Sequence, residues 1–441
     1  MNAAHYLEAY RILADDLPGQ GLPWLSAKRQ AALAQFSASG FPSPREEDWK
    51  YTNVSPIEKK LFKPLIGQPL RGQVLDRSWL DSYRLADAWS LVLVDGHFDQ
   101  GLSVLGGIPE GVIVTGLAEA LRAYPERVSD WLGTVVTPRQ LHGFIAFNTA
   151  FFADGAFVDV PAGISLEKPL QLIHVATHPE GLSNTRSLVV LAKNAEARVV
   201  ETFTGRADLS YLTAAITEIR IGANAVLEHY KVQSESGKAF HFGGIYVAQE
   251  RSARFRQHNM AFGGLLVRNE IHSGLHQAAE CELNGLFLVS RRQHVDNHIL
   301  IHHTEPCGIS RENYRGVLTD HARGIFQGRI VVHPQAQKTD AQMNNRNLLL
   351  SEDAEIDTKP QLEILADDVK CAHGVTVGQL DPESVFYLES RGVDRLSARN
   401  MLTFAFANEM VEKIGLGSLR ALVQDQLLNL FPQTGIRRDW L

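Results

Sequence analysis

Residues 344–392 read NNRNLLLSEDAEIDTKPQLEILADDVKCAHGVTVGQLDPESVFYLESRG, a stretch in which strand-like alternation leads to a Cys-x-His pair and then to a helical pattern. Successive side chains of a strand point to opposite faces, so Cys371 and His373 are expected on one face, about 7 Å apart along the strand. A thiol and an imidazole there could hold a metal ion or a sulfur species. Because a tetrahedral metal site takes four donors, or three and solvent, another strand or a partner chain would have to complete it.

The same pair also fits a packed core. Val369, Val375 and Val377 share the parity of the two residues, and free cysteine is among the most buried residue types. Judged from the residues alone, core packing is favoured over ligation, and both interpretations stay open.

The region from 151 to 379, which contains the pair, consists of short runs rich in Val, Ile, Phe and Thr that alternate with charged or amide residues. A small-residue turn followed by alternation recurs in it. The examples begin at Ala195, Ala223, Ser252, Ala278, Ala336 and Ala354, with one longer gap between Ala278 and Ala336. Such repeats predict a solenoid of stacked coils over residues 151–380, and we favour a right-handed parallel β-helix.

An antiparallel sandwich or barrel shows the same alternation and is the alternative fold. That fold would be expected to carry tight Asn-Gly or Asp-Gly hairpins, and the sole Asp-Gly of the region is Asp154-Gly155. The fold class predicted for the chain is therefore mainly β, a parallel solenoid flanked by helical regions at both ends.

Helical patterns flank the strand region. Residues 1–150 are expected to form a mostly helical N-terminal region, with one strand-like run at Ser90–Phe98. Residues 381–441 are expected to form a C-terminal helical domain that begins at Asp381, a good N-cap, followed by proline in the first turn. The broad apolar surface of these last helices must cover the solenoid or a partner.

Composition excludes several classes of protein. The chain has 441 residues, 44% of them hydrophobic, and a net charge of −7, without a basic stripe that would favour nucleic acid. It has no 18-residue apolar run and no secretory h-region, so no membrane association is expected and the cytoplasm is the default location. Its three cysteines, Cys281, Cys307 and Cys371, fit neither a disulfide framework nor a zinc-finger spacing.

Motifs for catalysis or nucleotide binding are missing from the sequence, including the P-loop, G-x-G-x-x-G, G-x-S-x-G and H-E-x-x-H patterns. The run Gln293–Pro306, QHVDNHILIHHTEP, places several polar residues on one parity of a strand: His294, Asp296, His298 and His302. This histidine band could ligate iron or zinc, but such a face is more often a solvated or interfacial wall. A polar cluster at Arg311–Arg323 contains no evident pair of catalytic carboxylates.

Two segments resemble one protein family. The segment Tyr314–Val393, with TKPQLEI and DDVKCAHGVTVGQLD, resembles the signature of the SufB/SufD family, the scaffold subunits of the SUF iron–sulfur cluster assembly machine. GFPSPREEDWKYT at Gly40–Thr52 is similar to the N-terminal motif of that family. The resemblance spans most of the chain and is closer to the SufD type, because SufB-type chains tend to be longer and richer in cysteine.

The resemblance implies a right-handed parallel β-helix and candidate site residues. The C-x-H-G motif of the family falls on Cys371, His373 and Gly374, at a strand expected to face a SufB-type paralogue. His373 and Cys371 are thus implied as candidate ligands of a nascent, transient iron–sulfur cluster shared with that partner. For Cys371, the roles of ligand, helper and core thiol all stay open.

The resemblance also implies a complex with a SufB-type paralogue and two copies of a SufC-type ATPase. The start of the C-terminal helices corresponds to the part of the family that docks the ATPase. The residues expected there are Phe386, Tyr387, Leu388, Arg391 and Gly392. This chain would then bind no nucleotide and would be a non-catalytic scaffold that helps to acquire iron; whether it forms a homodimer in isolation stays open. The competing interpretation is a stand-alone β-helix enzyme, either a metal-dependent hydrolase or a polysaccharide-active protein.

Overall fold

The computed structural model describes residues 3–67, 75–136 and 141–431. Residues 432–441, which belong to the predicted C-terminal helical domain, lie outside the described residues. No helix in the described ranges is long and apolar enough to cross a membrane.

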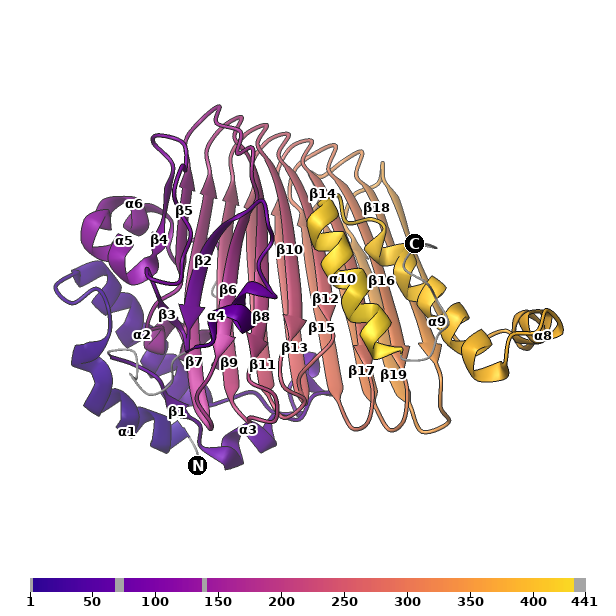
Figure 1. The fold of residues 1–441 in the computed structure, drawn as a ribbon. Coiled ribbons are helices and arrows are strands. Elements are labelled where there is room, and N and C mark those ends of the chain that lie inside the picture. Colours follow the sequence, from indigo (N-terminus) through magenta and orange to yellow (C-terminus); the bar gives the residue numbers. More distant parts are fainter. Residues whose placement is uncertain (1–2, 68–74, 137–140, 432–441) are drawn as a thin grey trace.

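The centre of the chain is a parallel β-solenoid (Figure 1). The chain passes back and forth between two ten-stranded sheets, so that the odd-numbered strands β5 to β19 lie in one sheet, here called sheet A. The even-numbered strands β6 to β20 lie in the other, sheet B. Every pairing within these two runs is parallel. The predicted parallel β-helix is confirmed, and the antiparallel alternative is wrong.

The two runs of strands have the following bounds. Sheet A contains β5 (Ala156–Val160), β7 (Gly181–Leu191), β9 (Leu212–Ile221), β11 (Phe240–Gln249), β13 (Leu266–Leu275), β15 (His294–His303), β17 (Arg323–Val332) and β19 (Glu355–Ile364). Sheet B contains β6 (Leu170–Ala176), β8 (Glu196–Gly205), β10 (Val226–Ser234), β12 (Arg254–Ala261), β14 (Glu280–Val289), β16 (Ile309–Leu318), β18 (Asp340–Leu349) and β20 (Lys370–Gly378). Asn284-Gly285, a dipeptide typical of hairpins, lies within β14 rather than in a turn.

A stack of tight turns leads from sheet A to sheet B and explains the small-residue repeats, except the one at Ala354, which lies between β18 of sheet B and β19 of sheet A. One residue in each turn has a positive φ: Asn194, Asn224, Ser252, Ala278, Cys307 and Lys338. The N–H of this residue donates to a carbonyl of the next turn, for example from Asn194 to Ala223. The following residue is often a buried alanine, because the chain there enters the interior. The gap that the sequence shows between Ala278 and Ala336 is filled by the turn at Cys307-Gly308, which contains no alanine.

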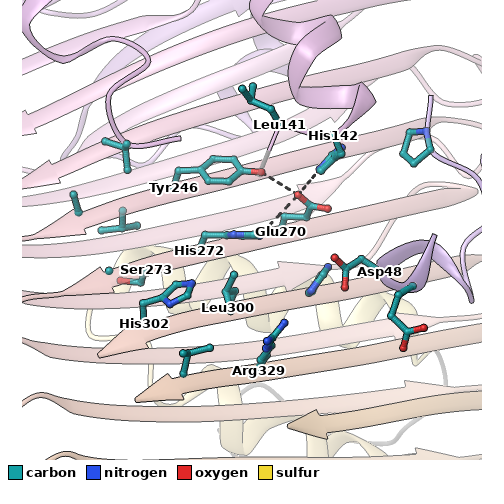
Figure 2. Close-up of a pocket in the computed structure, with 18 of the residues that line it drawn as sticks. Asp48, Leu141, His142, Tyr246, Glu270, His272, Ser273, Leu300, His302 and Arg329 are labelled. Atoms are coloured by element: carbon teal, nitrogen blue, oxygen red, sulfur yellow. Dashed lines mark hydrogen bonds and ion pairs between the residues drawn. The ribbon is translucent and has the colours of Figure 1, made fainter. Parts of the chain in front are cut away.

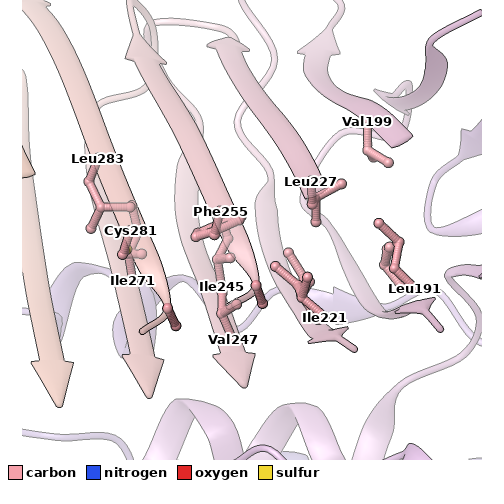
Figure 3. Close-up of a cluster of buried hydrophobic side chains, with 14 of the residues drawn as sticks. Leu191, Val199, Ile221, Leu227, Ile245, Val247, Phe255, Ile271, Cys281 and Leu283 are labelled. Carbon is pink, nitrogen blue, oxygen red and sulfur yellow. The ribbon is translucent and has the colours of Figure 1, made fainter. Parts of the chain in front are cut away.

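The interior of the solenoid is built from the inward parity of every strand (Figure 3). Strand neighbours stack identical positions of successive coils, so that Leu227 stands between Ala197 and Phe255 in the ladder of sheet B. Cys281 continues this column and is fully buried. Burial raises the pKa of its thiol far above the ordinary value, so Cys281 is a packing residue.

The N-terminal region covers the first coil and the outer face of sheet A. Its helices are α1 (Ala3–Leu13), η1 (Ala14–Asp16), α2 (Pro23–Ser39), η2 (Glu47–Trp49), α3 (Ser55–Lys60), α4 (Arg77–Asp81), α5 (Leu117–Ala123), α6 (Pro125–Trp131) and α7 (Gly143–Phe151). Its strands are β1 (Lys63–Pro64), β2 (Trp89–Val94), β3 (His97–Phe98) and β4 (Ile113–Gly116). Aromatic residues of α2 and α7, among them Phe36 and Phe147, pack in one cluster with residues of sheet A such as Phe242.

The C-terminal helices are α8 (Pro382–Ser390), α9 (Arg395–Val411) and α10 (Gly417–Leu430). Phe404 and Met410 of α9 and Leu419 of α10 pack in one cluster with Tyr230 and Leu286 of sheet B. In Figure 1, α9 and α10 lie over sheet B, whereas α8 projects away from the solenoid. Part of the apolar surface predicted for these helices, on α9 and α10, therefore packs against sheet B. The part on α8 is not covered by the solenoid.

Candidate functional site at the open end of the solenoid

The last coil of the solenoid is open. At the first coil, β2 lies beside β6 and β4 beside β5. At the last coil, β19 pairs with β17 and β20 with β18, and in the described part of the chain no further strand lies beside either. The residues of β20 are accordingly exposed or half-buried, whereas most of β14 is buried. Both last strands thus present unpaired backbone edges.

Cys371 and His373 lie on β20, on the face directed toward the interior. In the ladder, Cys371 stands beside Ala341 and His373 beside Met343, and both neighbours are fully buried. Cys371 is half-buried and packs against the core, while His373 is exposed. Because no coil follows in the described part of the chain, the inward face of β20 is accessible to solvent. The imidazole of His373, which a further coil would bury, is therefore exposed.

The thiol of Cys371 has a raised pKa. Burial is the main cause and the charge of Asp340 adds to it, although a hydrogen bond with the backbone of Ala341 acts in the opposite direction. The thiolate, and not the thiol, is the form that ligates metals. Cys371 is therefore protonated near neutral pH and would become a ligand only as a metal ion displaces its proton.

The N-terminal motif docks on the histidine band. The hydroxyl of Thr52 donates to Oδ2 of Asp296 at 2.6 Å and lies 3.0 Å from Nε2 of His294. Asp296 also accepts a hydrogen bond from Arg268 of β13. These band residues therefore anchor the segment that was recognised in the sequence at Gly40–Thr52, which explains their polarity without a metal.

Arg268 is the centre of this contact. Its guanidinium lies 3.8 Å from the centroid of the Trp49 ring and donates to the carbonyl of Asp48 at 2.9 Å. It also donates to Glu270 at 2.8 Å and lies 2.7 Å from Nδ1 of His298. The side chains of Arg268 and Glu270 are each 2% exposed. Arg268 and Glu270 both lie on β13, but Asp296, which also pairs with Arg268, lies on β15, and the aromatic cover lies some 220 residues away. Sequence patterns therefore did not reveal that these charges form one buried cluster.

A groove of about 1190 Å³ runs along the outer face of sheet A beside this contact (Figure 2). Tyr246 donates to Oε2 of Glu270 at 2.9 Å, and Nε2 of His142 lies 2.9 Å from the same oxygen. Burial lowers the pKa of His272, another residue of the groove, to about 4. This imidazole is therefore neutral at pH 7.

The polar cluster at Arg311–Arg323 is divided among three environments. Arg311 pairs with Asp340, and Arg315 donates to the carbonyl of Phe406 and to Glu409, which attaches α9 to the solenoid. Glu312 points into the interior, where its neighbours in the ladder are Leu283 and Met343. The cluster therefore does not assemble a pair of catalytic carboxylates.

Glu312 is fully buried, and neither carboxyl oxygen has a hydrogen-bond partner among the described residues. Burial raises its pKa to about 8. Between the ordinary pKa and this value only the unfolded chain loses the proton, so the stability of the fold decreases as pH rises through this window.

Replacing Glu312 with glutamine is expected to flatten the dependence of stability on pH. Through this one carboxyl, the unfolding free energy of the natural chain should fall by about 2 kcal/mol between pH 5 and pH 7. In Glu312→Gln, which has no carboxyl at this position, that fall should be absent. Urea unfolding at a series of pH values measures the difference. The exposed Glu352→Gln is the control and should follow the natural chain; parallel curves for Glu312→Gln would contradict the burial argument.

The residues predicted to contact the ATPase lie on α8 or directly after it. Asp381 caps the helix as expected, since its carboxylate accepts from the N–H groups of Glu383 and Ser384. Phe386 is 70% and Tyr387 57% exposed, whereas Leu388 is half-buried. The guanidinium of Arg391 lies 5.3 Å from the Tyr387 ring centroid, and Gly392 ends the segment with a φ of +88°. The helix thus presents two aromatic rings and a cation away from the solenoid.

Comparison with known proteins gives matches along most of the chain. The family model described as SufBD protein N-terminal region matches residues 1–172, and the one described as SUF system FeS cluster assembly, SufBD core domain, matches residues 174–406. The iron–sulfur cluster assembly protein SufD of Escherichia coli is 32% identical over 88% of this chain and 89% of its own length. An iron–sulfur cluster assembly SufBD family protein of Synechocystis is 31% identical over 89% of this chain and 88% of its own length.

The fold and the site define a β-solenoid protein with helices at both ends and a thiol and an imidazole on its open last coil. With the matches just described, the chain belongs to the SufB/SufD family, a component of the SUF system of iron–sulfur cluster assembly. The predicted resemblance to SufD is confirmed.

Proposed function

We propose that this chain is a non-catalytic scaffold subunit that pairs with a SufB-type paralogue through its open last coil. The observation that carries the proposal is the open coil itself. Unpaired strand edges invite another strand, and natural proteins normally cover or interrupt them. In the described part of the chain, β20 runs without a proline and without a covering strand, whereas β19 carries Lys359 and Pro360 near its middle. A paralogue that ends in a coil of the same kind would pair with these edges by strand addition.

In this arrangement, Cys371 and His373 contribute to a nascent iron–sulfur cluster at the interface, and the iron is cargo. The exposed His373 is the accessible donor, and Cys371 behind it needs a metal ion to lose its proton. The two residues lack the number of donors that a complete site requires, so the SufB-type partner supplies the others. This division explains why the residues lie at the edge of the fold.

The SufC-type ATPase docks, in the same proposal, on α8. Phe386 and Tyr387 are exposed and Arg391 lies against the Tyr387 ring, an aromatic and cationic composition typical of interaction hot spots. Helix α9 connects this surface to sheet B through Arg315 and Glu409. A displacement of α8 on nucleotide hydrolysis would therefore act on the solenoid wall near the open coil, as coupling between two sites requires.

Co-expression with a SufB-type and a SufC-type chain tests the proposal. We expect size-exclusion chromatography with light scattering to show one complex of all three chains, with this chain and the SufB-type chain in equal amounts. A chain that stays separate from both, but turns over a glycan or a small ester, would establish the β-helix enzyme instead. The dispersal of the Arg311–Arg323 cluster argues against that alternative.

Replacing His373 with alanine is expected to reduce the rate of cluster formation in the reconstituted complex at least tenfold. The complex itself should still form, because strand addition uses the backbone of β20 and the His373 side chain is exposed. The absorbance of the cluster during anaerobic reconstitution is the measurement. Thr376→Ala, an exposed change on the opposite face of β20, is the control. Unchanged cluster formation in His373→Ala would refute the ligand role.

A further inference from the structure

Two imidazoles meet on the outer face of sheet A, on a different sheet from Cys371 and His373. His302 lies near the end of β15, and His333 directly follows β17. Nδ1 of His302 and Nε2 of His333 are 3.2 Å apart, with the ring centroids 5.4 Å apart. Two nitrogens bound to one metal ion at about 2.1 Å would be separated by about 3.0 to 3.4 Å. The pair is therefore already spaced as two ligands of one ion.

The carboxylate of Glu363 belongs to the same row of neighbouring residues across sheet A as His302. His302 stands beside Val331 in the ladder, and Val331 stands beside Glu363 of β19. The ion pair with Arg329 lowers the pKa of Glu363, and His302 and His333 act in the same direction. Glu363 therefore lies two strands from His302 on the same face of sheet A, where it pairs with Arg329.

The pair is accessible. His302 and His333 are half-buried and line the groove of about 1190 Å³, which opens to solvent. In an open groove, water competes for both nitrogens, so a hydrogen bond between the rings stabilises the fold little. The pair differs in its contacts from His294, which meets Thr52 of the N-terminal segment, and from His298, which meets Arg268 of β13.

We propose that His302 and His333 bind one divalent first-row transition-metal ion, with Glu363 and solvent completing its coordination. Imidazole is a preferred ligand of Zn²⁺, Fe²⁺, Ni²⁺ and Cu²⁺. Among the residues that the structure describes, no three His, Cys, Asp or Glu side chains already stand in ligand geometry. Glu363 must therefore turn from Arg329 toward the ion, and the ring that donates in the His302–His333 contact must carry its proton on the other nitrogen. The site is independent of the scaffold function.

The test is titration of the full chain with Co²⁺, followed by its visible absorption bands. Cys307→Ser, Cys371→Ser and His373→Ala form the background, so that exposed thiols and the open coil do not contribute. We expect one equivalent of Co²⁺ to bind with micromolar affinity, and Zn²⁺ to displace it. His302→Ala and His333→Ala should each weaken binding at least tenfold, and Glu363→Gln several-fold.

His276→Ala is the matched control, because this histidine also lines the groove but pairs with Glu305. It should leave Co²⁺ binding unchanged, and circular dichroism melts should show that all variants remain folded. Absence of saturable binding in the background chain would overturn the proposal. Co²⁺ binding by His302→Ala and His333→Ala that is as tight as binding by the background chain would also overturn it. Neither result would affect the scaffold proposal, whose test is formation of the three-chain complex.

Discussion

Replacing Phe386 and Tyr387 together with alanine is expected to weaken binding of the SufC-type ATPase by about 100- to 1000-fold. A loss of this size corresponds to about 3 to 4 kcal/mol for the two rings together. Both rings are mostly exposed here, so the loss falls on the interface rather than on the fold. Isothermal titration calorimetry of the two purified chains measures it. The melting temperature of the variant should equal that of the natural chain.

Ile12→Ala is the control for this double variant, since Ile12 is 72% exposed and lies on α1, remote in sequence from α8. Its affinity for the ATPase should be unchanged. Retention of full affinity by Phe386→Ala/Tyr387→Ala would show that α8 is not the docking element. Deletion of residues 394–441 should also abolish binding, because it removes α9, against which α8 packs. It also takes α10 from sheet B and would uncover a large apolar cluster. The double variant is therefore the sharper experiment.

Replacing Arg268 with methionine is expected to lower the free energy of unfolding by about 3 to 5 kcal/mol. The substitution leaves Glu270 and Asp296 buried without the cation that compensates them, and it removes the stacking on Trp49. Burial would raise the pKa of Glu270, but the charges of His142 and Arg268 bring it well below the ordinary value. Urea unfolding followed by tryptophan fluorescence measures the loss.

Arg220→Met is a matched control for this variant. Arg220 also stacks on a tryptophan, at 4.3 Å from the Trp131 ring centroid, and also pairs with a glutamate, Glu250. Its ion pair is partly exposed, so the expected loss is at most about 1 kcal/mol. The triple variant Arg268→Met/Glu270→Gln/Asp296→Asn removes the uncompensated charges and should recover part of the stability. Equal losses for Arg268→Met and Arg220→Met would contradict the role assigned to burial.

The architecture could be predicted from local patterns because each coil repeats the same chemistry. Alternation with a period of two, interrupted by small residues that tolerate tight turns, indicated strands and their corners. The coil at Cys307 was missed because the turn there is made without an alanine. The N-cap at Asp381 was also predictable, since capping depends on residues within one turn of the helix.

The candidate site could be predicted only in part. Parity placed Cys371 and His373 on one face, and the ladder agrees. Parity could not predict that Cys371 is half-buried and His373 exposed, because the exposure of a side chain on β20 depends on whether another coil follows. The histidine band appeared as one polar face, but its members differ: His294 meets Thr52 of the N-terminal segment, His298 meets Arg268, and His302 meets His333.

By itself, the sequence determined that residues 151–379 consist of strands, that they repeat as coils, and which side chains of a strand share a face. Only the tertiary structure decided which face is inside, as with the buried Glu312, and which distant segment covers a polar surface, as Trp49 covers Arg268. It also decided that strands of the N-terminal region pair with the first coil, whereas no strand among the described residues pairs with the outer edge of the last. The physical reason is range: periodicity and capping act over a few residues, whereas burial and charge compensation depend on segments that only the stacking of coils brings together.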